Sequence, residues 1–480
     1  MTEADPAKAA NTFRRILLKE PRRLDALVGL GCELRRLGKA EEAETWLRKA
    51  LRIRADEPTA LRARGGQLQL QGRYAEAMAL ADAAIAVQPG CCAAWLTRGD
   101  SLANSGRQDL AVDDYMKALA DPGIAFDALL RLGKMYRVLG RLDEARGALD
   151  RALVLQPDSP LPTYERALLA LETGDFAAGW RDYEARWRSD RFAGTWGFVP
   201  PEMFPALKTG PSALDLAGKR VLLMGEQGIG DQVMFAGQIP DLARVAAGVV
   251  CVCEPRLLRL FAASFPTVAF LDPKTARIDA DAVDVLVAMG SLGSAFRQTW
   301  ADFPGSAYLK PRPEVRARWA ERLGAPKSRL RVGLSWRGGT PQTGRQNRSI
   351  PLADLAPILN LPDCEFVSLQ YGDVAAEIAA VNAGRADPLR AFPPEDFSDF
   401  EEMAGLIANL GVVVSVQNAA VHLSGAIGTR CLTLVPHNPE WRYLRAGEAM
   451  PWYGSVRLIR QTTPGDWGPL IAEAAAALSS

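Results

Sequence analysis

Residues 31–50 read GCELRRLGKAEEAETWLRKA, and the same framework of small residues returns three times along the chain. It returns as GGQLQLQGRYAEAMALADAA at 65–84, GDSLANSGRQDLAVDDYMKA at 99–118 and GKMYRVLGRLDEARGALDRA at 133–152. Each copy starts 34 residues after the previous one, with glycine at its first and eighth positions and alanine at its thirteenth and twentieth. Small residues within helices permit close approach, and a glycine between helices permits reversal of the chain. This pattern predicts a stack of helical hairpins.

The 34-residue step resembles the tetratricopeptide repeat. It predicts roughly five repeats over residues 24–191, behind a single helix at 6–19. We assign residues 1–192 to this α-solenoid. The resemblance implies a protein partner, because such solenoids bind peptides or protein segments in a groove.

The last repeat departs from the pattern and is rich in aromatic residues. Gly174 keeps the turn column, but Gly179 and Arg186 replace the two alanines. Terminal repeats are atypical where one face meets something other than a repeat. We therefore expect Trp180, Tyr183 and Trp187 to pack against a second module, which follows a connector at 193–218.

From residue 219 the periodicity changes to short apolar runs that alternate with helical segments. The runs of strand length lie at 220–224, 248–253, 268–271, 282–288, 331–336, 365–369, 412–416 and 431–434. This alternation predicts parallel sheets covered by helices on both faces. We expect two Rossmann-like halves in series, 219–325 and 326–480, with a ligand cleft at the carboxyl ends of their strands.

Several motifs of this region resemble the GT-B glycosyltransferases. They are GEQGIGD at 225–231, VGLSWRG at 332–338, the tripeptide Ser368-Leu369-Gln370, and VQNAAVHLSGA at 416–426. The nearest likeness is to heptosyltransferase-like proteins with N-terminal tetratricopeptide repeats, and a more distant one is to O-GlcNAc transferase. The resemblance implies metal-independent transfer of a sugar from a nucleotide-activated donor to a protein held by the repeats, with no other cofactor. Bacterial flagellin glycosyltransferases share this organisation, so flagellin is the partner that the resemblance suggests.

Transfer needs a base for the acceptor hydroxyl and groups that hold the diphosphate. We predict Asp231 as the base, with Glu226 second; the alternative for Asp231 is a helix-start acid. The glycines Gly228 and Gly230 either approach the ligand or merely close a strand-to-helix turn.

The predicted donor site lies at strand ends of the second half. A helix start can bind a phosphate through its free N–H groups. The predicted donor-binding residues are Gln417, Asn418, Ala419 and His422 at that helix start, Arg345 and Arg348 in a preceding loop, and Trp336, Gln370 and Tyr371 at strand ends. For His422 the alternative is a packing histidine, and for the arginine loop a solvated loop.

Two residues depart from the family pattern. Gln417-Asn418 stands where relatives have Asp-Thr, and Tyr371 stands where they often have Lys. These changes leave open a second function, a non-catalytic adaptor that binds protein without turnover. Transfer to a glycolipid is a third alternative.

The charge and composition argue against some other classes. The net charge is +1, which gives no general attraction to nucleic acid or to an anionic membrane. No run approaches the ~20 apolar residues of a membrane-spanning helix, and residues 1–10 do not resemble a secretory signal. The seven cysteines and two histidines show no zinc spacing, so we expect no metal site. A cytoplasmic location is the expectation.

Overall fold

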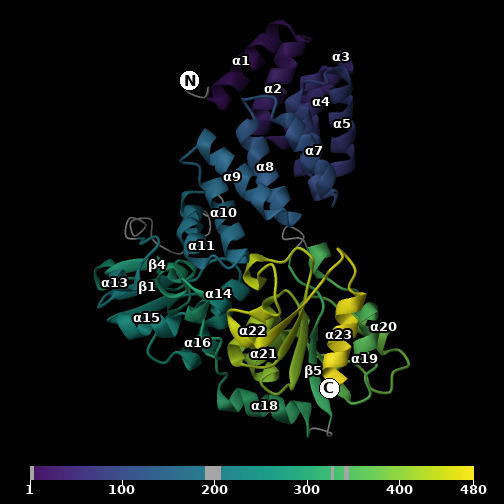
Figure 1. Cartoon of the computed structure of the whole chain (residues 1–480). Helices are drawn as coiled ribbons and strands as arrows, with labels where there is room; N and C mark the ends of the chain where they lie inside the picture. The colour runs from purple at the N-terminus through teal and green to yellow at the C-terminus, as the bar shows by residue number, and fades with distance from the viewer. Residues whose placement is uncertain (1–4, 190–206, 326–328, 340–344, 480) are drawn as a thin grey trace. The chain divides into compact units, whose positions relative to one another are not determined.

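The computed structural model describes residues 5–189, 207–325, 329–339 and 345–479 of the 480-residue chain. Its contacts divide the chain into two compact units, Met1–Glu165 and Arg166–Ser480 (Figure 1). Helix α10 (Pro160–Glu172) crosses this division. Of the predicted connector 193–218, residues 193–206 lie outside the described residues.

The first unit consists of one lone helix, α1, followed by helices in pairs. These are α1 (Pro6–Lys19), α2 (Leu24–Arg36), α3 (Ala40–Ile53), α4 (Pro58–Leu70), α5 (Tyr74–Val87), α6 (Cys92–Asn104), α7 (Gln108–Ala118), α8 (Ala125–Val138) and α9 (Leu142–Leu155). The turn glycines Gly38, Gly72, Gly106 and Gly140 have φ between 72° and 79°, in the left-handed region that glycine tolerates best. Inside the pairs, a Cβ on Gly99 would lie 2.6 Å from the Tyr115 ring. The predicted α-solenoid is confirmed.

The second unit begins with the last repeat, α11 (Phe176–Tyr183) and the 3₁₀ turn η1 (Glu184–Arg188). A parallel sheet follows, in the order β3-β2-β1-β4. Its strands are β1 (Arg220–Met224), β2 (Gly248–Val252), β3 (Ala269–Leu271) and β4 (Val285–Ala288). The first strand is followed by two short helices, α14 (Ile229–Ala236) and α15 (Ile239–Val245). The break at Gly237 admits Tyr308, since a Cβ there would lie 2.8 Å from the Tyr308 ring.

The second sheet has the strand order β6-β5-β7-β8-β10-β9. Its strands are β5 (Leu330–Ser335), β6 (Cys364–Ser368), β7 (Val412–Val416), β8 (Cys431–Val435), β9 (Ala449–Met450) and β10 (Tyr453–Arg460), all parallel except β9. The main helices of this half are α18 (Pro313–Leu323), α20 (Ala375–Asn382), α21 (Phe400–Ile407), α22 (Ala419–Ile427) and α23 (Gly468–Ser479). All five residues of β7 are buried, as expected for a strand covered on both faces. Two parallel-sheet halves confirm the predicted α/β class.

Trp180 of the last repeat lies among aromatic rings of both halves. Its ring centroid is 6.4 Å from that of Phe235 on α14, and 5.7 and 6.2 Å from those of Trp441 and Trp452. We call these four residues the aromatic seam. The indole N–H of Trp180 donates to the Arg297 carbonyl at 2.8 Å. The expectation that the last repeat packs against the second module is confirmed.

Among the described residues, none of the helices combines the length and the apolar character needed to cross a membrane.

Candidate functional site

Asn418 lies at the start of α22, at the carboxyl edge of the second sheet. It is the N-cap of that helix, and its Oδ1 accepts from the Ala420 N–H at 2.9 Å and from Ser415 Oγ at 3.1 Å. Its Nδ2 donates to Ser335 Oγ at 2.7 Å and to the Arg337 carbonyl at 3.0 Å. These four bonds use the whole hydrogen-bonding capacity of the amide. In this structure the Asn418 side chain joins the ends of β5 and β7, and its role as a diphosphate ligand stays a prediction.

Two arginines converge on Glu440 beside this helix start. Arg348, at the end of η9 (Arg345–Arg348), lies 3.0 Å from Glu440 Oε1, and Arg442 lies 3.1 Å from Glu440 Oε2. Arg442 also donates through Nε to Asp231 Oδ1 at 2.6 Å, which links the second half to the first. Both guanidinium side chains are 13% exposed. We call Arg348, Glu440, Arg442 and Asp231 the charged chain.

Arg442 remains charged in this setting. Burial alone would lower its pKa, but the carboxylates of Asp231 and Glu440 raise the pKa above its ordinary value. A buried cation held between two carboxylates is a place where an anion can compete for the guanidinium.

Gln417 adds a hydrogen-bond donor to the same edge. Its side chain is buried, and its Oε1 accepts from the Glu440 N–H at 3.2 Å. Its Nε2 is also buried and has no hydrogen-bond partner among the described residues. Leaving a buried donor unsatisfied costs about 1–3 kcal/mol. A ligand or water that reached Gln417 Nε2 would satisfy this donor without breaking an existing bond.

His422 lies inside α22 between tyrosines. Its Nδ1 is 3.2 Å from the Tyr453 hydroxyl and its Nε2 is 3.3 Å from the Tyr443 hydroxyl. Burial lowers the pKa of His422 to about 3, and the charge of Arg442 adds to the effect, so the imidazole is neutral. The packing alternative describes His422 better than a phosphate-binding role.

The glycine loop of the first half lies against α22. Gly228 is the N-cap of α14, and its N–H donates to Asp231 Oδ2 at 3.1 Å, so the first-turn carboxylate satisfies the N–H of the cap residue. A Cβ on Gly230 would lie 3.3 Å from His422 Cδ2 and 3.6 Å from Ala419 Cα. The structure thus brings Gly230 of the first half to Ala419 of the second, and Asp231 of the first half to Arg442 of the second.

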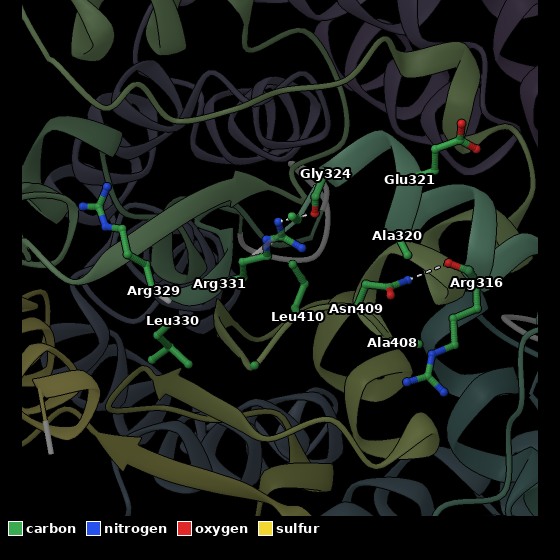
Figure 2. Close-up of a pocket in the computed structure, with 12 residues that line it drawn as sticks. Arg316, Ala320, Glu321, Gly324, Arg329, Leu330, Arg331, Ala408, Asn409 and Leu410 are labelled. Carbon is green, nitrogen blue, oxygen red and sulfur yellow. Dashed lines mark hydrogen bonds between the residues drawn. The ribbon is translucent and has the colours of Figure 1, made fainter. Parts of the chain in front are cut away.

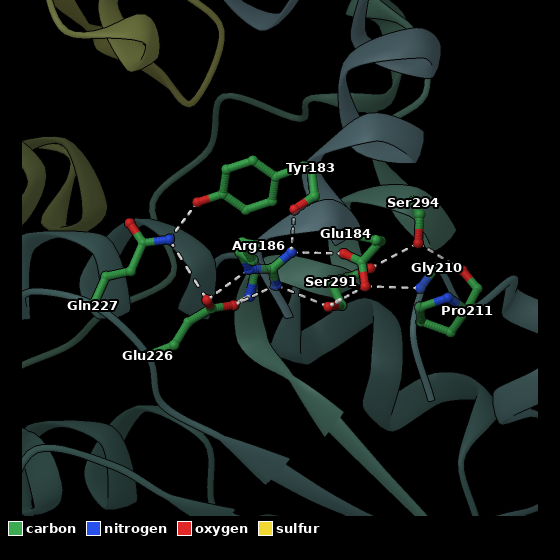
Figure 3. Close-up of polar contacts among 10 residues, drawn as sticks. Tyr183, Glu184, Arg186, Gly210, Pro211, Glu226, Gln227, Ser291 and Ser294 are labelled. Carbon is green, nitrogen blue, oxygen red and sulfur yellow. Dashed lines mark hydrogen bonds and ion pairs between the residues drawn. The ribbon is translucent and has the colours of Figure 1, made fainter. Parts of the chain in front are cut away.

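Glu226 is held inside the protein. Its side chain is 3% exposed, and both its oxygens accept from Arg186, at 3.0 and 2.8 Å (Figure 3). The Gly290 N–H donates to the same carboxylate at 2.7 Å. A base needs a lone pair that reaches the substrate. The prediction of Glu226 as a second catalytic carboxylate is therefore corrected: it is a structural ion-pair partner.

Two predicted strand-end residues are also internal. Trp336 is fully buried in the core of the second sheet and donates through Nε1 to Glu377 at 3.1 Å, so it offers no face for stacking. Gln370 Oε1 accepts from the N–H groups of Trp336 and Arg337, each at 2.8 Å. Both assignments to donor binding are corrected, because these side chains tie β5 to β6 and α20.

Two other predicted residues stay at the surface of this edge. Tyr371 is 52% exposed, and its hydroxyl lies 3.5 Å from the Gly339 carbonyl. Arg345 is exposed and donates to the same carbonyl at 3.2 Å. Residues 340–344, between Gly339 and Arg345, lie outside the described residues.

The sequence predicted no site role for Arg442, Glu440 or Arg186. Arg442 and Glu440 follow the predicted strand at 431–434, so the rule that placed Gln417 and Asn418 at a strand end also applied to them. Arg186 replaced an alanine of the repeat, and that substitution was its only signal.

A broad pocket of about 790 Å³ lies away from these residues, at the amino edge of the second sheet (Figure 2). Its lining includes Arg316, Arg331 and Asn409. Arg331 donates to the Gly324 carbonyl at 2.7 Å, and Asn409 to the Arg316 carbonyl at 2.9 Å. None of the predicted site residues lines this pocket, and ligands of parallel sheets bind at the opposite edge.

Comparisons with known proteins extend over both units. Tetratricopeptide-repeat models match residues 1–58, 68–124 and 126–171. Cellulose synthase operon protein C of Xanthomonas axonopodis pv. citri is 34% identical over 182 residues, covering 36% of this chain and 12% of that protein.

Two solved structures that align with this chain are YrrB, a tetratricopeptide-repeat protein with an unusual peptide-binding site, and PilF of Pseudomonas aeruginosa. YrrB is 18% identical, covers 34% of this chain and 84% of its own, and has a TM-score of 0.29. PilF is 21% identical, covers 34% of this chain and 75% of its own, and has a TM-score of 0.33.

Protein FlbA of Caulobacter vibrioides is 30% identical over 439 residues. The alignment covers 85% of this chain and 70% of FlbA, so it extends from the repeats into the α/β halves. The chain belongs to the family of Protein FlbA.

Proposed function

We propose that this chain is a GT-B glycosyltransferase that moves a sugar from a nucleotide-activated donor to a protein held by its repeats. Flagellin is the acceptor that the sequence resemblance suggests, and the cytoplasm is the proposed location. A repeat solenoid joined to two parallel-sheet halves agrees with this function, since the repeats can hold a protein and the sheet edges a nucleotide.

The observation that carries the proposal is the convergence of Arg348 and Arg442 on Glu440 at the carboxyl edge of the second sheet. Guanidinium groups suit a diphosphate because their N–H groups match phosphate oxygens in pairs. The diphosphate would take the place of the Glu440 carboxylate, which is 34% exposed and can turn toward solvent. Gln417 Nε2 supplies a further donor beside it.

In this proposal the arginines neutralise the charge that develops on the leaving nucleoside diphosphate, so transfer needs no metal. Arg442 also holds Asp231 in the charged chain. A diphosphate that competes for Arg442 would release the Asp231 carboxylate toward the acceptor hydroxyl. Asp231 would then accept the hydroxyl proton as the sugar carbon is attacked.

The test measures binding of UDP, GDP and CDP to the full chain by calorimetry, in wild type and in Arg348→Gln. Each charge-assisted bond contributes roughly 1.5–3 kcal/mol, so affinity for the preferred nucleotide should fall by about tenfold or more. Arg322→Gln is the matched control, because Arg322 pairs with Asp396 on another face of the same half. Equal affinities in wild type and Arg348→Gln would contradict the proposed site.

The acceptor is tested by intact-mass analysis of flagellin from cells with and without this gene. A hexose or related sugar increment that depends on the gene supports transfer to flagellin. An unchanged mass, with nucleotide binding intact, would redirect the search to other acceptors.

A non-catalytic adaptor is the second candidate. The observation that favours it is that Asp231 is engaged by Arg442 and by the Gly228 N–H, which leaves no unoccupied acid at the cleft among the predicted bases. An adaptor would bind its protein partner with no nucleotide affinity and no sugar increment on any partner. Calorimetry of the wild type alone therefore separates the two candidates.

A further inference from the structure

Arg186 of the last repeat is the most completely engaged cation of the described second unit. Its guanidinium donates to both oxygens of Glu226, to Ser291 Oγ at 2.9 Å, to Glu184 at 2.8 Å and to the Tyr183 carbonyl at 3.0 Å (Figure 3). Five hydrogen bonds use all five N–H groups of an arginine. The side chain is fully buried.

Aromatic rings enclose the same guanidinium. The centroids of Tyr183 and Trp187 lie 4.3 and 4.2 Å from its central carbon. Burial alone would lower the pKa of Arg186, but the carboxylates of Glu226 and Glu184 raise it above the ordinary value. A lysine could not reproduce this arrangement, because its ammonium lacks the planar fork.

One partner of Arg186 and one partner of Tyr183 belong to the glycine loop, residues 225–230. Glu226 lies at the start of this loop, and the Gln227 side-chain amide donates to the Tyr183 hydroxyl. Gln227 has φ 60°, a left-handed conformation that a residue with a Cβ adopts at a cost of roughly 1–2 kcal/mol. Contacts from the last repeat thus hold the side chain of the strained residue and the side chain of Glu226, which precedes it.

The loop leads directly into the candidate site. Gln227 is followed by Gly228, the N-cap whose N–H binds Asp231, and by Gly230, which lies against His422 and Ala419. A change in the Gln227 conformation would displace these groups together.

We propose that Arg186 and Tyr183 are positioning residues of the donor site: the last repeat holds Gln227 of the glycine loop in its left-handed conformation. This inference rests on the proposed function for its effect on nucleotide binding. The repeat then supplies part of the nucleotide site, in addition to whatever it contributes to holding protein.

The experiment compares wild type, Tyr183→Phe and Arg186→Lys as full chains. Tyr183→Phe keeps the ring and removes only the hydroxyl that accepts from Gln227, so it tests the loop even where Arg186→Lys fails to fold. Tyr136→Phe is the matched control, because it removes a hydroxyl that lies near Met116 inside the solenoid.

Hydrogen exchange of the amides in residues 225–231 is the first measurement. Loss of one hydrogen bond should speed exchange in this segment by about three- to tenfold in Tyr183→Phe, with helices α2–α9 unchanged. The affinity for the preferred nucleoside diphosphate should weaken by a similar factor, while affinity for the protein partner stays the same. Tyr136→Phe should alter neither.

Two outcomes would overturn the inference. In one, loop exchange is the same in wild type and both variants. In the other, Tyr183→Phe speeds exchange equally throughout the second unit, which would show general packing and no specific hold on the loop. Because exchange does not depend on turnover, a wild type that binds no nucleotide would count against the proposed function alone.

Discussion

His422 lies in a row of buried side chains that runs across both halves. Tyr443 and Tyr453 contact its two ring nitrogens, and the Tyr453 hydroxyl is 3.4 Å from that of Tyr308, which donates to the Val233 carbonyl at 2.7 Å. Burial raises the pKa of all three tyrosines. The row therefore stays uncharged near neutral pH.

This row predicts a pH dependence of stability. Below about pH 6.5 the unfolded chain protonates His422, while the folded chain does so only near the lowered pKa of about 3. Stability should be full above pH 6.5 and fall as the pH drops, by up to about 1.4 kcal/mol per pH unit. Denaturant unfolding between pH 7.5 and 5.5 measures the slope. The slope of the free energy of unfolding against pH should be smaller in His422→Gln and unchanged in His437→Gln, since His437 is exposed. Equal slopes in wild type and His422→Gln would contradict the prediction.

Asp231→Asn tests the base at the same scale. The change keeps the size and polarity of the side chain but removes its basicity, so transfer should fall by about 10²–10⁴-fold. Protein-partner affinity should not change. Single-turnover transfer with the preferred nucleotide sugar is the measurement. Transfer at the wild-type rate would leave Asp231 only its capping and ion-pair roles.

Sequence position located the edge of the sheet but not the direction of each side chain. Four predicted site residues lie at strand ends, namely Gln417, Asn418, Trp336 and Gln370. The side chains of the last three turn inward and bond to neighbouring elements. Whether a polar side chain at a strand end faces a ligand or the next strand depends on tertiary partners. Those partners lie far away along the sequence, so no local pattern reveals them.

At the scale of elements, two glycines in the middle of helices have opposite surroundings. A Cβ on Gly99 of α6 would lie 2.6 Å from Tyr115, whereas a Cβ on Gly147 of α9 would meet nothing within 4 Å. Glycine has a low helix propensity because its backbone is freest when unfolded.

These surroundings predict opposite effects of alanine. Gly147→Ala should stabilise the chain by roughly 0.5–1 kcal/mol through helix propensity. Gly99→Ala should destabilise it by about 1–3 kcal/mol, because the Tyr115 ring must move. Urea unfolding of wild type and of the two variants measures the sign of each change in the free energy of unfolding. A stabilised Gly99→Ala chain would show that the hairpin can open without cost.

Helices of the solenoid were predictable because a 34-residue period repeats the same packing requirement several times. The α/β elements each occur once, and their prediction rested on single apolar runs. The apolar runs did not predict strand β10, which is partly exposed, or helix α18. The break between α14 and α15 depends on Tyr308, which lies far along the sequence.

At the scale of the whole molecule, the compact second unit starts at Arg166 and includes α11. Trp180 fills the aromatic seam, and Arg186 neutralises Glu226. Removing them would expose apolar rings and leave a buried carboxylate without its cation.

Two fragments test this organisation. Residues 166–480 should fold as a monomer, whereas residues 192–480 should aggregate or melt at a much lower temperature. Breaking a buried ion pair alone costs about 3–5 kcal/mol, and the loss of a large aromatic core residue costs a similar amount. Size-exclusion chromatography and thermal unfolding compare the fragments. Equal melting temperatures would mean that the last repeat is dispensable to the α/β halves.

Trp180 also bears on how such chains can diversify over generations. A gene rearrangement that exchanges the solenoid must place its junction before Phe176, since a foreign terminal repeat would lack the ring that fits between Gly293 and Trp441. Exchange of helices α1–α9 alone would then leave the aromatic seam intact. Helix α11 would have to stay with the sheets, since its tryptophan is buried among their aromatic rings.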